Sequence, residues 1–391
     1  MSDPQALPST GVAPDWQAVR REFPALDHLT YLNIAQKAAV PRKVEAAIAE
    51  WMADVHATGG ATAFSMSPIE DTRRAVANTF GMPQGSVALI KNTSEGMNIV
   101  AQGFPWRPGD NVVISSMEHE NNTFPWRHLK ARGVEVRIAE PDEQGRVTLA
   151  SYEPIIDART RVLAVGWVVY GNGYKADLPT LAAFCKSRGV RLVVDGIQAV
   201  GILATPIQEL GVDVLVAGGH KAQLSLAGAG FLYATPEMIE LLQPPYAAKF
   251  SFESNDRTLA EPKLAADAHR FEYGNPNFLG CWVQKRSAEW IASLGLANIE
   301  ARVKALTTRL IDGAEARQIR VRTPRPWSER AGIVSFDVGN RADALVASLQ
   351  ARNILVSQKD GHLRASLHFY NDEADVDRFL DAVAELGGGR G

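Results

Sequence analysis

A lysine and an aspartate stand at the ends of two apolar stretches and could do chemistry together. Asp195 ends the run Arg191–Asp195, and Lys221 follows the run Val212–Ala217 and two glycines. A carboxylate or an ammonium group is costly to bury without a partner. A lysine whose pKa is lowered by burial is an amine nucleophile suited to a Schiff base with an aldehyde. The pair therefore predicts a site for an aldehyde, although an aspartate after a strand is also a common turn residue.

Two further polar groups follow apolar runs in the same way. Thr93 and Ser94 open a helix after the run Val87–Lys91, and His119 follows the run Asn111–Ser115. The start of a helix offers N–H groups to an anion, although an ordinary helix cap has the same appearance. A histidine ring can stack on a flat ligand. An amine, a carboxylate for a ring nitrogen, an anion cradle and a stacking ring are what pyridoxal 5'-phosphate needs, so the combination predicts that cofactor.

These residues need a sheet whose strands end side by side. From about residue 86 the chain repeats strand, turn and helix, which favours an α/β fold with a mostly parallel sheet covered on both faces. Ligands of such sheets bind at the carboxyl ends of the strands, where the candidates stand. We expect strands at 87–91, 111–115, 134–139, 162–168, 191–195, 212–217 and 230–233.

The pattern changes near residue 280, which predicts a second, smaller α+β domain. We expect an N-terminal arm over residues 1–30, which starts loose and polar, a large cofactor-binding domain over 31–280, and a small domain over 281–391. Asp15 should cap a short helix at 15–23. "YLNIAQKAAVP" is expected to be a loop. Further helices are expected at 42–57, 68–80, 178–188, 281–294, 297–316, 342–352 and 372–386, and small-domain strands at 318–322, 332–338 and within 354–369.

Composition argues against several classes of protein. The 391 residues carry a formal net charge of -3 with no long run of one sign, which argues against nucleic-acid and membrane-surface binding. No long apolar run suggests a membrane span, and the first residues do not resemble a signal peptide. The two cysteines fit a reducing compartment, so a cytoplasmic location is expected. No GxGxxG motif supports a dinucleotide enzyme, and no HxxxH or CxxC spacing supports a metal site.

The chain resembles the class V aminotransferase family of fold-type I pyridoxal-phosphate enzymes. The resemblance runs from "YLNIAQ" to "LRASLHFYNDEADVDRFL", and its most specific stretches are "NTSEGMNIVA", "MEHENNTFPW", "VVDGIQAVG", "GGHK", "RFEYGNPN" and "LRASLHFYN". The pattern is most similar to the cysteine desulfurase and selenocysteine lyase branch and to isopenicillin N epimerases. It implies an aspartate-aminotransferase-like fold with a seven-stranded large-domain sheet, an amino-acid substrate and a homodimer.

The resemblance also implies how the cofactor ring would be held. Lys221 would form the Schiff base with the cofactor aldehyde. Asp195 would pair with the ring nitrogen, and Gln198 would bond the phenolic oxygen of the ring. His119 would stack on the ring. Each of these residues lies in one of the matching stretches.

Other residues would bind phosphate and substrate. By the same resemblance, Thr93, Ser94 and His220 would hold the phosphate, and Asn275 would reach the phosphate in the other subunit. Arg364 would clamp the α-carboxylate of the substrate with its two-pronged guanidinium.

The sequence departs from the family at several positions. The desulfurases carry a mobile cysteine shortly before the carboxylate-binding arginine, and "NILVSQKDGHLRASL" has none before Arg364. Gly218 stands where a phosphate-binding serine is usual, and Trp167 where a histidine is common. Either Tyr170 or Asn172 would lie beside the ring. We therefore expect a reshaped pocket around an intact set of cofactor ligands.

The missing cysteine before Arg364 argues against persulfide chemistry. We expect a pyridoxal-phosphate enzyme that acts at Cα of an amino acid and is not a cysteine desulfurase. A C–S lyase that eliminates the β-substituent of a cysteine-derived substrate is favoured. Transamination is the alternative, and epimerisation is a further one in which Tyr170 or Tyr174 would supply a second acid. An inactive shell used for binding is disfavoured because Lys221, Asp195 and Arg364 are all present.

Overall fold

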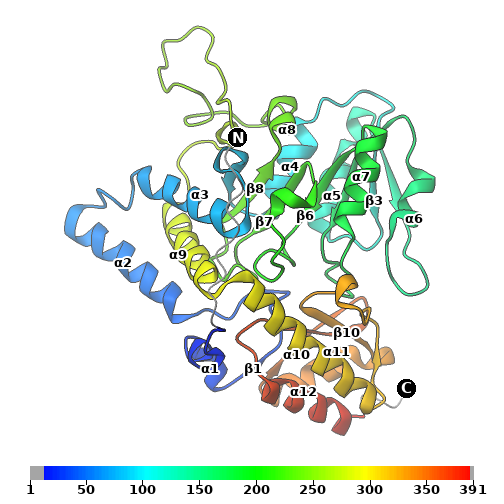
Figure 1. The fold of residues 1–391 in the computed structure, drawn as a ribbon. Coiled ribbons are helices and arrows are strands. Elements are labelled where there is room, and N and C mark those ends of the chain that lie inside the picture. The colour runs from blue at the N-terminus through cyan, green and yellow to red at the C-terminus, as the bar shows by residue number, and fades with distance from the viewer. Residues whose placement is uncertain (1–12, 388–391) are drawn as a thin grey trace.

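The large domain is organised around one twisted sheet of seven strands. A computed structural model describes residues 13–387, so the loose start expected for the N-terminal arm lies outside the described residues (Figure 1). The strand order is β2-β8-β7-β6-β5-β3-β4, in which β8 is antiparallel to both neighbours and the other pairs are parallel. The bounds are β2 Val87–Ile90, β3 Asn111–Ser115, β4 Glu135–Ala139, β5 Thr160–Gly166, β6 Arg191–Asp195, β7 Val214–Gly218 and β8 Gly230–Ala234. The predicted mostly parallel, seven-stranded sheet is confirmed.

Apolar side chains on both faces explain why the central strands are buried. Val193 of β6 packs in one apolar cluster with Met97 of α4 (Thr93–Gly103). Val194, the next residue, packs in a different cluster with Leu181 of α7 (Leu178–Arg188). Because side chains alternate between the faces of a strand, the two clusters show that helices cover the sheet on both sides.

The small domain has its own sheet and its own core. Its four strands are ordered β12-β13-β10-β9, with bounds β9 Arg320–Val321, β10 Ile333–Asp337, β12 Ser357–Lys359 and β13 His362–Ser366. Helices α10 (Leu296–Ala316), α11 (Ala342–Gln350) and α12 (Glu373–Glu385) supply apolar side chains to the same core cluster and lie below the large sheet in Figure 1.

The N-terminal part of the chain joins this small domain. Thr30 and Tyr31 form the short strand β1, which pairs in parallel with β11 (Ile354–Leu355). The pairing differs from the expectation that "YLNIAQKAAVP" is a loop, since Tyr31 begins that stretch. A strand of two residues carries no period of its own, and its partner lies near the other end of the chain. The proposed division at residues 30 and 280 stays a prediction.

Most predicted elements lie where the sequence pattern indicated. Asp15 caps α1, accepting from the N–H groups of Gln17 and Ala18 at 3.0 Å. The main shift is in β5, which ends at Gly166 because the apolar run continues into a turn and not along the ladder. The remaining helices are α1 Trp16–Arg20, α2 Arg42–Thr58, α3 Ser67–Phe80, α5 Phe124–Arg127, α6 Leu149–Tyr152, α8 Pro236–Leu241 and α9 Phe278–Leu294.

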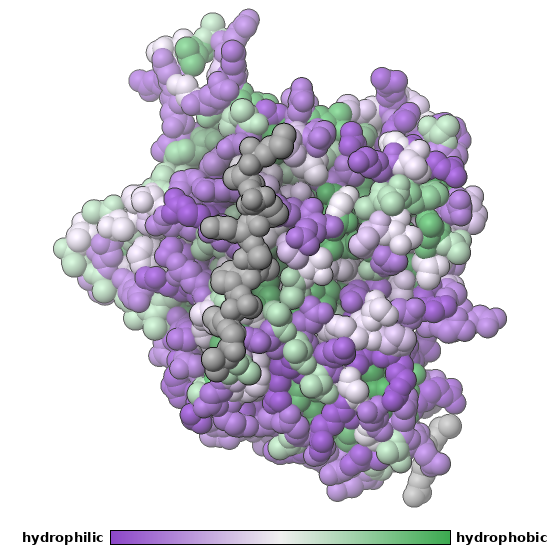
Figure 2. Space-filling view, viewed as in Figure 1, coloured by the Kyte–Doolittle hydropathy of each residue, from purple (hydrophilic) through white to green (hydrophobic). Residues whose placement is uncertain are grey.

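The surface view is dominated by polar side chains, with apolar residues in small groups between them (Figure 2). Among the described helices, none has the length and apolar character that crossing a membrane would need.

Candidate active site

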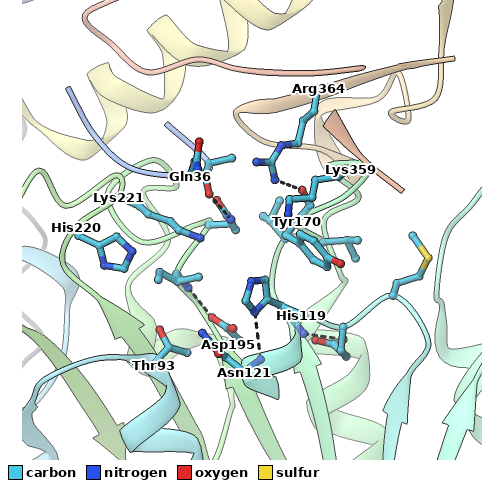
Figure 3. A pocket seen from close by; sticks show the side chains of 18 residues that line it. Gln36, Thr93, His119, Asn121, Tyr170, Asp195, His220, Lys221, Lys359 and Arg364 are labelled. Carbon is cyan, nitrogen blue, oxygen red and sulfur yellow. Dashed lines mark hydrogen bonds between the residues drawn. The ribbon is translucent and has the colours of Figure 1, made fainter. Parts of the chain in front are cut away.

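A cavity of about 220 Å³ lies at the carboxyl ends of the parallel strands. Its floor comes from the ends of large-domain strands, and β12 and β13 of the small domain contribute the opposite wall (Figure 3). Eight of the predicted site residues line it: Thr93, His119, Tyr170, Asp195, Gln198, His220, Lys221 and Arg364. Ser94 and Asn275 do not line it. The large sheet and the small-domain sheet thus bring together side chains as far apart in the sequence as Thr93 and Arg364.

Lys221 lies in the turn that follows β7, and Asp195 ends the neighbouring strand β6. Their residues are 9% and 6% exposed, respectively. Burial lowers the pKa of Lys221 to about 8, which makes the amine easier to deprotonate. Burial raises the pKa of Asp195 to about 6, and the nearby Lys221 opposes that rise. Each charge therefore stabilises the other, and the lysine still loses its proton more easily than a lysine in water.

The turn that presents Lys221 depends on a residue without a side chain. The Gly219 N–H donates to the carbonyl oxygen of Ala229 at 2.7 Å. A Cβ atom at Gly219 would lie 2.9 Å from that same oxygen, closer than van der Waals contact allows. Glycine here lets two backbone segments meet directly, which fixes the direction in which the chain leaves β7.

The Asp195 carboxylate fits the nitrogen of a pyridoxal ring. One of its oxygens accepts a hydrogen bond from the Ile197 N–H at 3.0 Å. No described residue donates to the other oxygen, although a buried carboxylate ordinarily needs more than one donor. A protonated ring nitrogen would supply such a donor. The residues present therefore fit pyridoxal phosphate.

His119 is held as a plate beside this carboxylate. Its Nδ1 accepts a hydrogen bond from the Asn121 N–H at 3.1 Å, which assigns the remaining ring proton to Nε2 in the neutral form. Burial lowers the pKa of His119 below its usual value, so the neutral ring predominates near pH 7. The Tyr170 ring meets it edge to face, with centroids 5.0 Å apart.

The predicted phosphate cradle is partly in place. Thr93 begins α4 and is 1% exposed, and its hydroxyl accepts from the Gly218 N–H at 3.2 Å. His220 lines the same part of the cavity. Gly218, where the resemblance places a serine, brings no hydroxyl, and its N–H is already bonded to Thr93. Ser94, half-buried, lies outside the lining. The roles of these residues in phosphate binding stay predictions.

Gln198 and Arg364 are two buried polar residues of the cavity lining. The Gln198 side-chain Nε2 donates to the carbonyl oxygen of Ala35 at 3.0 Å, which leaves its second N–H available to a ring oxygen. Arg364 donates from Nε to the hydroxyl of Ser357 at 3.0 Å and from Nη1 to the carbonyl oxygen of Tyr170 at 2.6 Å. Burial lowers the pKa of Arg364 to about 10, so it remains a cation at neutral pH.

The two candidates for the position beside the ring are separated by the structure. Tyr170 lines the cavity, whereas the Asn172 amide donates to the carbonyl oxygen of Gly145 at 2.6 Å, away from it. Tyr174 and Trp167 line a different cavity. Of the two tyrosines suggested as a second acid, only Tyr170 is at this site.

Sequence reasoning missed two charged residues of the cavity. Glu118 directly precedes His119 and accepts hydrogen bonds from the Gly166 N–H at 3.0 Å and from the Asn122 amide at 2.8 Å. Burial raises the pKa of Glu118 to about 7. Lys359 enters from β12. Glu118 could have been found because it directly precedes His119 in "MEHENN". Nothing in the sequence indicated that Lys359 lies opposite the large sheet.

Both cysteines lie away from this cavity. Cys185 in α7 and Cys281 in α9 are 1% and 4% exposed. Burial raises the pKa of each thiol to about 12. No cysteine is among the described residues that line the cavity. Within residues 13–387, no cluster of three or more histidine, cysteine or acidic residues is placed to hold a metal ion.

Comparison with known proteins identifies the family. The sequence profile described as "Aminotransferase class-V" matches residues 30–379. The chain belongs to the class V aminotransferases. It is therefore a pyridoxal-phosphate-dependent enzyme with fold type I, as the sequence predicted.

Proteins named as cysteine desulfurases are similar over nearly the whole chain. A protein of Pyrococcus abyssi (strain GE5 / Orsay) named "Probable cysteine desulfurase" is 30% identical, with 94% of this chain and 96% of that protein covered. The apo structure of a cysteine desulfurase from Thermococcus onnurineus NA1 is 27% identical with a TM-score of 0.86, covering 95% of this chain and 97% of that one. A variant of the protein C-DES with glycine covalently linked to its pyridoxal-phosphate cofactor is 22% identical with a TM-score of 0.87, covering 95% of this chain and 100% of that one, and shows the shared fold alone.

These relatives contradict the expectation that the chain is not a cysteine desulfurase. The expectation relied on one missing cysteine before Arg364. A missing side chain cannot exclude the class, because a thiol that accepts sulfur can also come from outside the pocket. The β-elimination lyase was favoured only among the reactions left after that exclusion, so it falls with the exclusion.

Proposed function

We propose that this class V enzyme removes the sulfur atom of L-cysteine, leaving L-alanine, and passes it to a thiol that enters from outside the cavity. The main support is the meeting of Lys221, Asp195 and Arg364 in one cavity of a chain that is 30% identical to a protein named for this activity. The cavity-lining residues include no cysteine, which supports an external acceptor.

Different residues of the cavity would bind the substrate, move the proton and hold the ring. Arg364, held at two of its nitrogens, would bind the α-carboxylate of the substrate. Lys221, with its pKa lowered to about 8, would hold the proton taken from Cα and return a proton to the carbon that loses sulfur. His119 and Asp195 would fix the plane and the charge of the ring. When bound, pyridoxal phosphate supplies the electron sink that makes the Cα proton acidic.

The proposed overall reaction is balanced by one acceptor thiol. L-Cysteine and a thiol give L-alanine and a persulfide. The Cβ–S bond breaks, an S–S bond forms, and Cβ gains the hydrogen that makes it a methyl group. The sulfur is oxidised and the carbon is reduced, so no further oxidant or reductant is needed.

The test is to identify both products of cysteine. The holoenzyme is incubated with L-cysteine and an excess of dithiothreitol, and alanine and sulfide are measured. We expect them in equal amounts, and we expect the rate to rise with the dithiothreitol concentration when L-cysteine is held constant. Lys221→Ala should abolish both products. Pyruvate with ammonia in place of alanine, or cofactor that accumulates as its pyridoxamine form, would contradict the proposal.

We also propose a cytoplasmic homodimer. Phe64, Tyr246 and Tyr273 are large aromatic residues that are 50%, 60% and 38% exposed, and aromatic residues are enriched at protein interfaces. Asn275 lies exposed in a second hollow, lined in part by Tyr273, where a partner's cofactor phosphate could approach. Support for the compartment is the pair of free, buried cysteines. Light scattering should give twice the 42.4 kDa chain mass, and a monomer with full activity would refute the dimer.

A further inference from the structure

Lys359 is a cation of the cavity that has no role so far. Neither cofactor binding nor binding of the substrate α-carboxylate, as proposed above, uses it. It ends β12 on the small-domain wall, and its side chain extends toward the cavity beside Tyr170 (Figure 3). Its Nζ lies 5.8 Å from the centre of the Tyr170 ring. Among the described residues, no carboxylate forms an ion pair with it. It is half-buried, so this charge is partly shielded from water.

The other charged groups of the cavity already have roles or partners. Lys221 and Asp195 would be used by the cofactor, and Arg364 by the substrate α-carboxylate. Glu118 is bonded to the Gly166 N–H and to two side chains on the floor. With these groups accounted for, Lys359 is the cation that still faces the space where a substrate side chain would lie.

The neighbouring acidic residue does not neutralise this charge. Asp360 is exposed, and its Oδ2 lies 3.0 Å from the position that a Cβ atom on Gly171 would occupy. Its carboxylate is thus turned toward the Gly171 backbone, and it makes no ion pair within 4.0 Å of Lys359. Lys359 acts on the cavity itself, since its charge contributes to the lowered pKa of both His119 and Lys221.

We propose that Lys359 binds a negatively charged group on the side chain of the substrate, so that the cavity selects amino acids with a short anionic side chain, including cysteine as its thiolate. The inference rests on the proposed function in taking the cavity as the place where an amino acid meets the cofactor. A single Arg364 can pair with only one carboxylate in the two-pronged geometry, so a second anion requires a second cation. The rival assignment is that Lys359 assists Arg364 at the α-carboxylate.

The sharpest probe is a pair of amino acids that differ in charge and hardly in shape. L-Aspartate and L-asparagine are titrated into the holoenzyme, and the change in visible absorbance of the cofactor gives a dissociation constant for each. The wild-type enzyme should bind aspartate at least about tenfold more tightly, the size expected for a charge-assisted hydrogen bond in a partly shielded site. Lys359→Gln should reduce this preference to within about threefold by weakening aspartate and leaving asparagine unchanged.

Two further variants serve as controls. Lys37→Gln removes the same charge from an exposed lysine next to Gln36, on the rim but outside the cavity lining. It should keep the wild-type preference. Lys359→Arg keeps the charge and should retain most of the preference. If Lys359→Gln loses its cofactor, Lys359→Met takes its place, and a wild-type enzyme without the preference still overturns the proposal.

Three results would overturn the proposal. One is a wild-type enzyme that binds aspartate and asparagine equally well, or neither of them. A second is an equal weakening of both ligands by Lys359→Gln, which would assign Lys359 to the α-carboxylate. The third is loss of the preference in Lys37→Gln as well. If the enzyme makes alanine from cysteine but binds aspartate and asparagine equally well, only this inference is wrong. If it prefers aspartate but makes no alanine, only the proposed function is wrong.

Discussion

The Nη1 of Arg364 donates a 2.6 Å hydrogen bond to the backbone carbonyl oxygen of Tyr170. Arg364 belongs to the small-domain sheet, and Tyr170 follows the last strand residues of β5 in the large sheet. The bond therefore fixes the guanidinium against the opposite wall of the cavity before any substrate arrives. A clamp held in advance loses little conformational entropy on binding, which favours tight and oriented capture of a carboxylate.

Arg364→Lys should lower kcat/KM for L-cysteine by about a hundredfold or more. Lysine keeps the charge but cannot hold Ser357, Tyr170 and a carboxylate at once. Steady-state kinetics would check this, and the visible absorbance of the bound cofactor should not change. Arg378→Lys, a change at an exposed arginine that bonds the Arg352 carbonyl oxygen, is the matched control and should have little effect. Equal kinetics in both variants would contradict the clamp.

Removal of the Lys221 amine should change how the cofactor-free protein responds to pH. The pKa of Lys221 is lowered from 10.5 to about 8, so the folded protein binds fewer protons than the unfolded chain between those pH values. The free energy of unfolding should therefore rise with pH across this window and carry a penalty below it. Urea unfolding of Lys221→Met should show a gain on the order of 2 kcal/mol at pH 7 that disappears by pH 10.5. A gain that is constant with pH would contradict the burial of this charge.

His119 should act through its flat ring more than through its nitrogen atoms. His119→Phe keeps an aromatic plate, whereas His119→Ala removes it. We expect the alanine variant to release pyridoxal phosphate about tenfold more readily, and the phenylalanine variant to stay within about threefold of the wild-type enzyme. Equilibrium dialysis against graded cofactor concentrations measures both. If the two variants release the cofactor equally readily, stacking is not the role of this residue.

The double variant Cys185→Ala/Cys281→Ala tests the external acceptor directly. Both thiols are buried and have a pKa raised to about 12, so neither is expected to carry sulfur. Alanine formation from L-cysteine with dithiothreitol should remain within about twofold of the wild-type rate. The unfolding midpoint would show any cost of the lost packing separately. Complete loss of alanine formation in a folded variant would mean that one of these thiols is the acceptor.

The strand ends of the large domain could be predicted from the sequence because each strand carries its own signal. β6 has the predicted bounds, Arg191–Asp195, since its apolar residues at 192–194 lie between two charged residues. Lys221 and Asp195 could be placed at one edge because parallel strands end together. The same reasoning failed at β1, where pairing with β11 is set by the packing of distant segments.

Residues brought in by the small domain could not be found in this way. Lys359 reaches the cavity because β12 pairs with β13 and the whole sheet faces the large domain, and no local pattern reports that orientation. Asn275 and Ser94 matched family motifs, yet neither lines this cavity. Motif matching therefore placed residues near the strand ends, and Arg364, in the cavity, but it did not find Lys359 on the small-domain wall.

The pairing of β1 with β11 also limits how the gene can be divided. Thr30 and Tyr31 satisfy backbone groups of Ile354 and Leu355, and Arg20 anchors the same region through an ion pair with Asp375 at 2.6 Å. A fragment that begins at residue 281 would expose that strand edge and leave the Asp375 carboxylate without its cation. Such a fragment would tend to aggregate, because unpaired strand edges recruit other chains. Expression of the small domain alone should therefore succeed only when residues 13–41 are fused to it or supplied alongside.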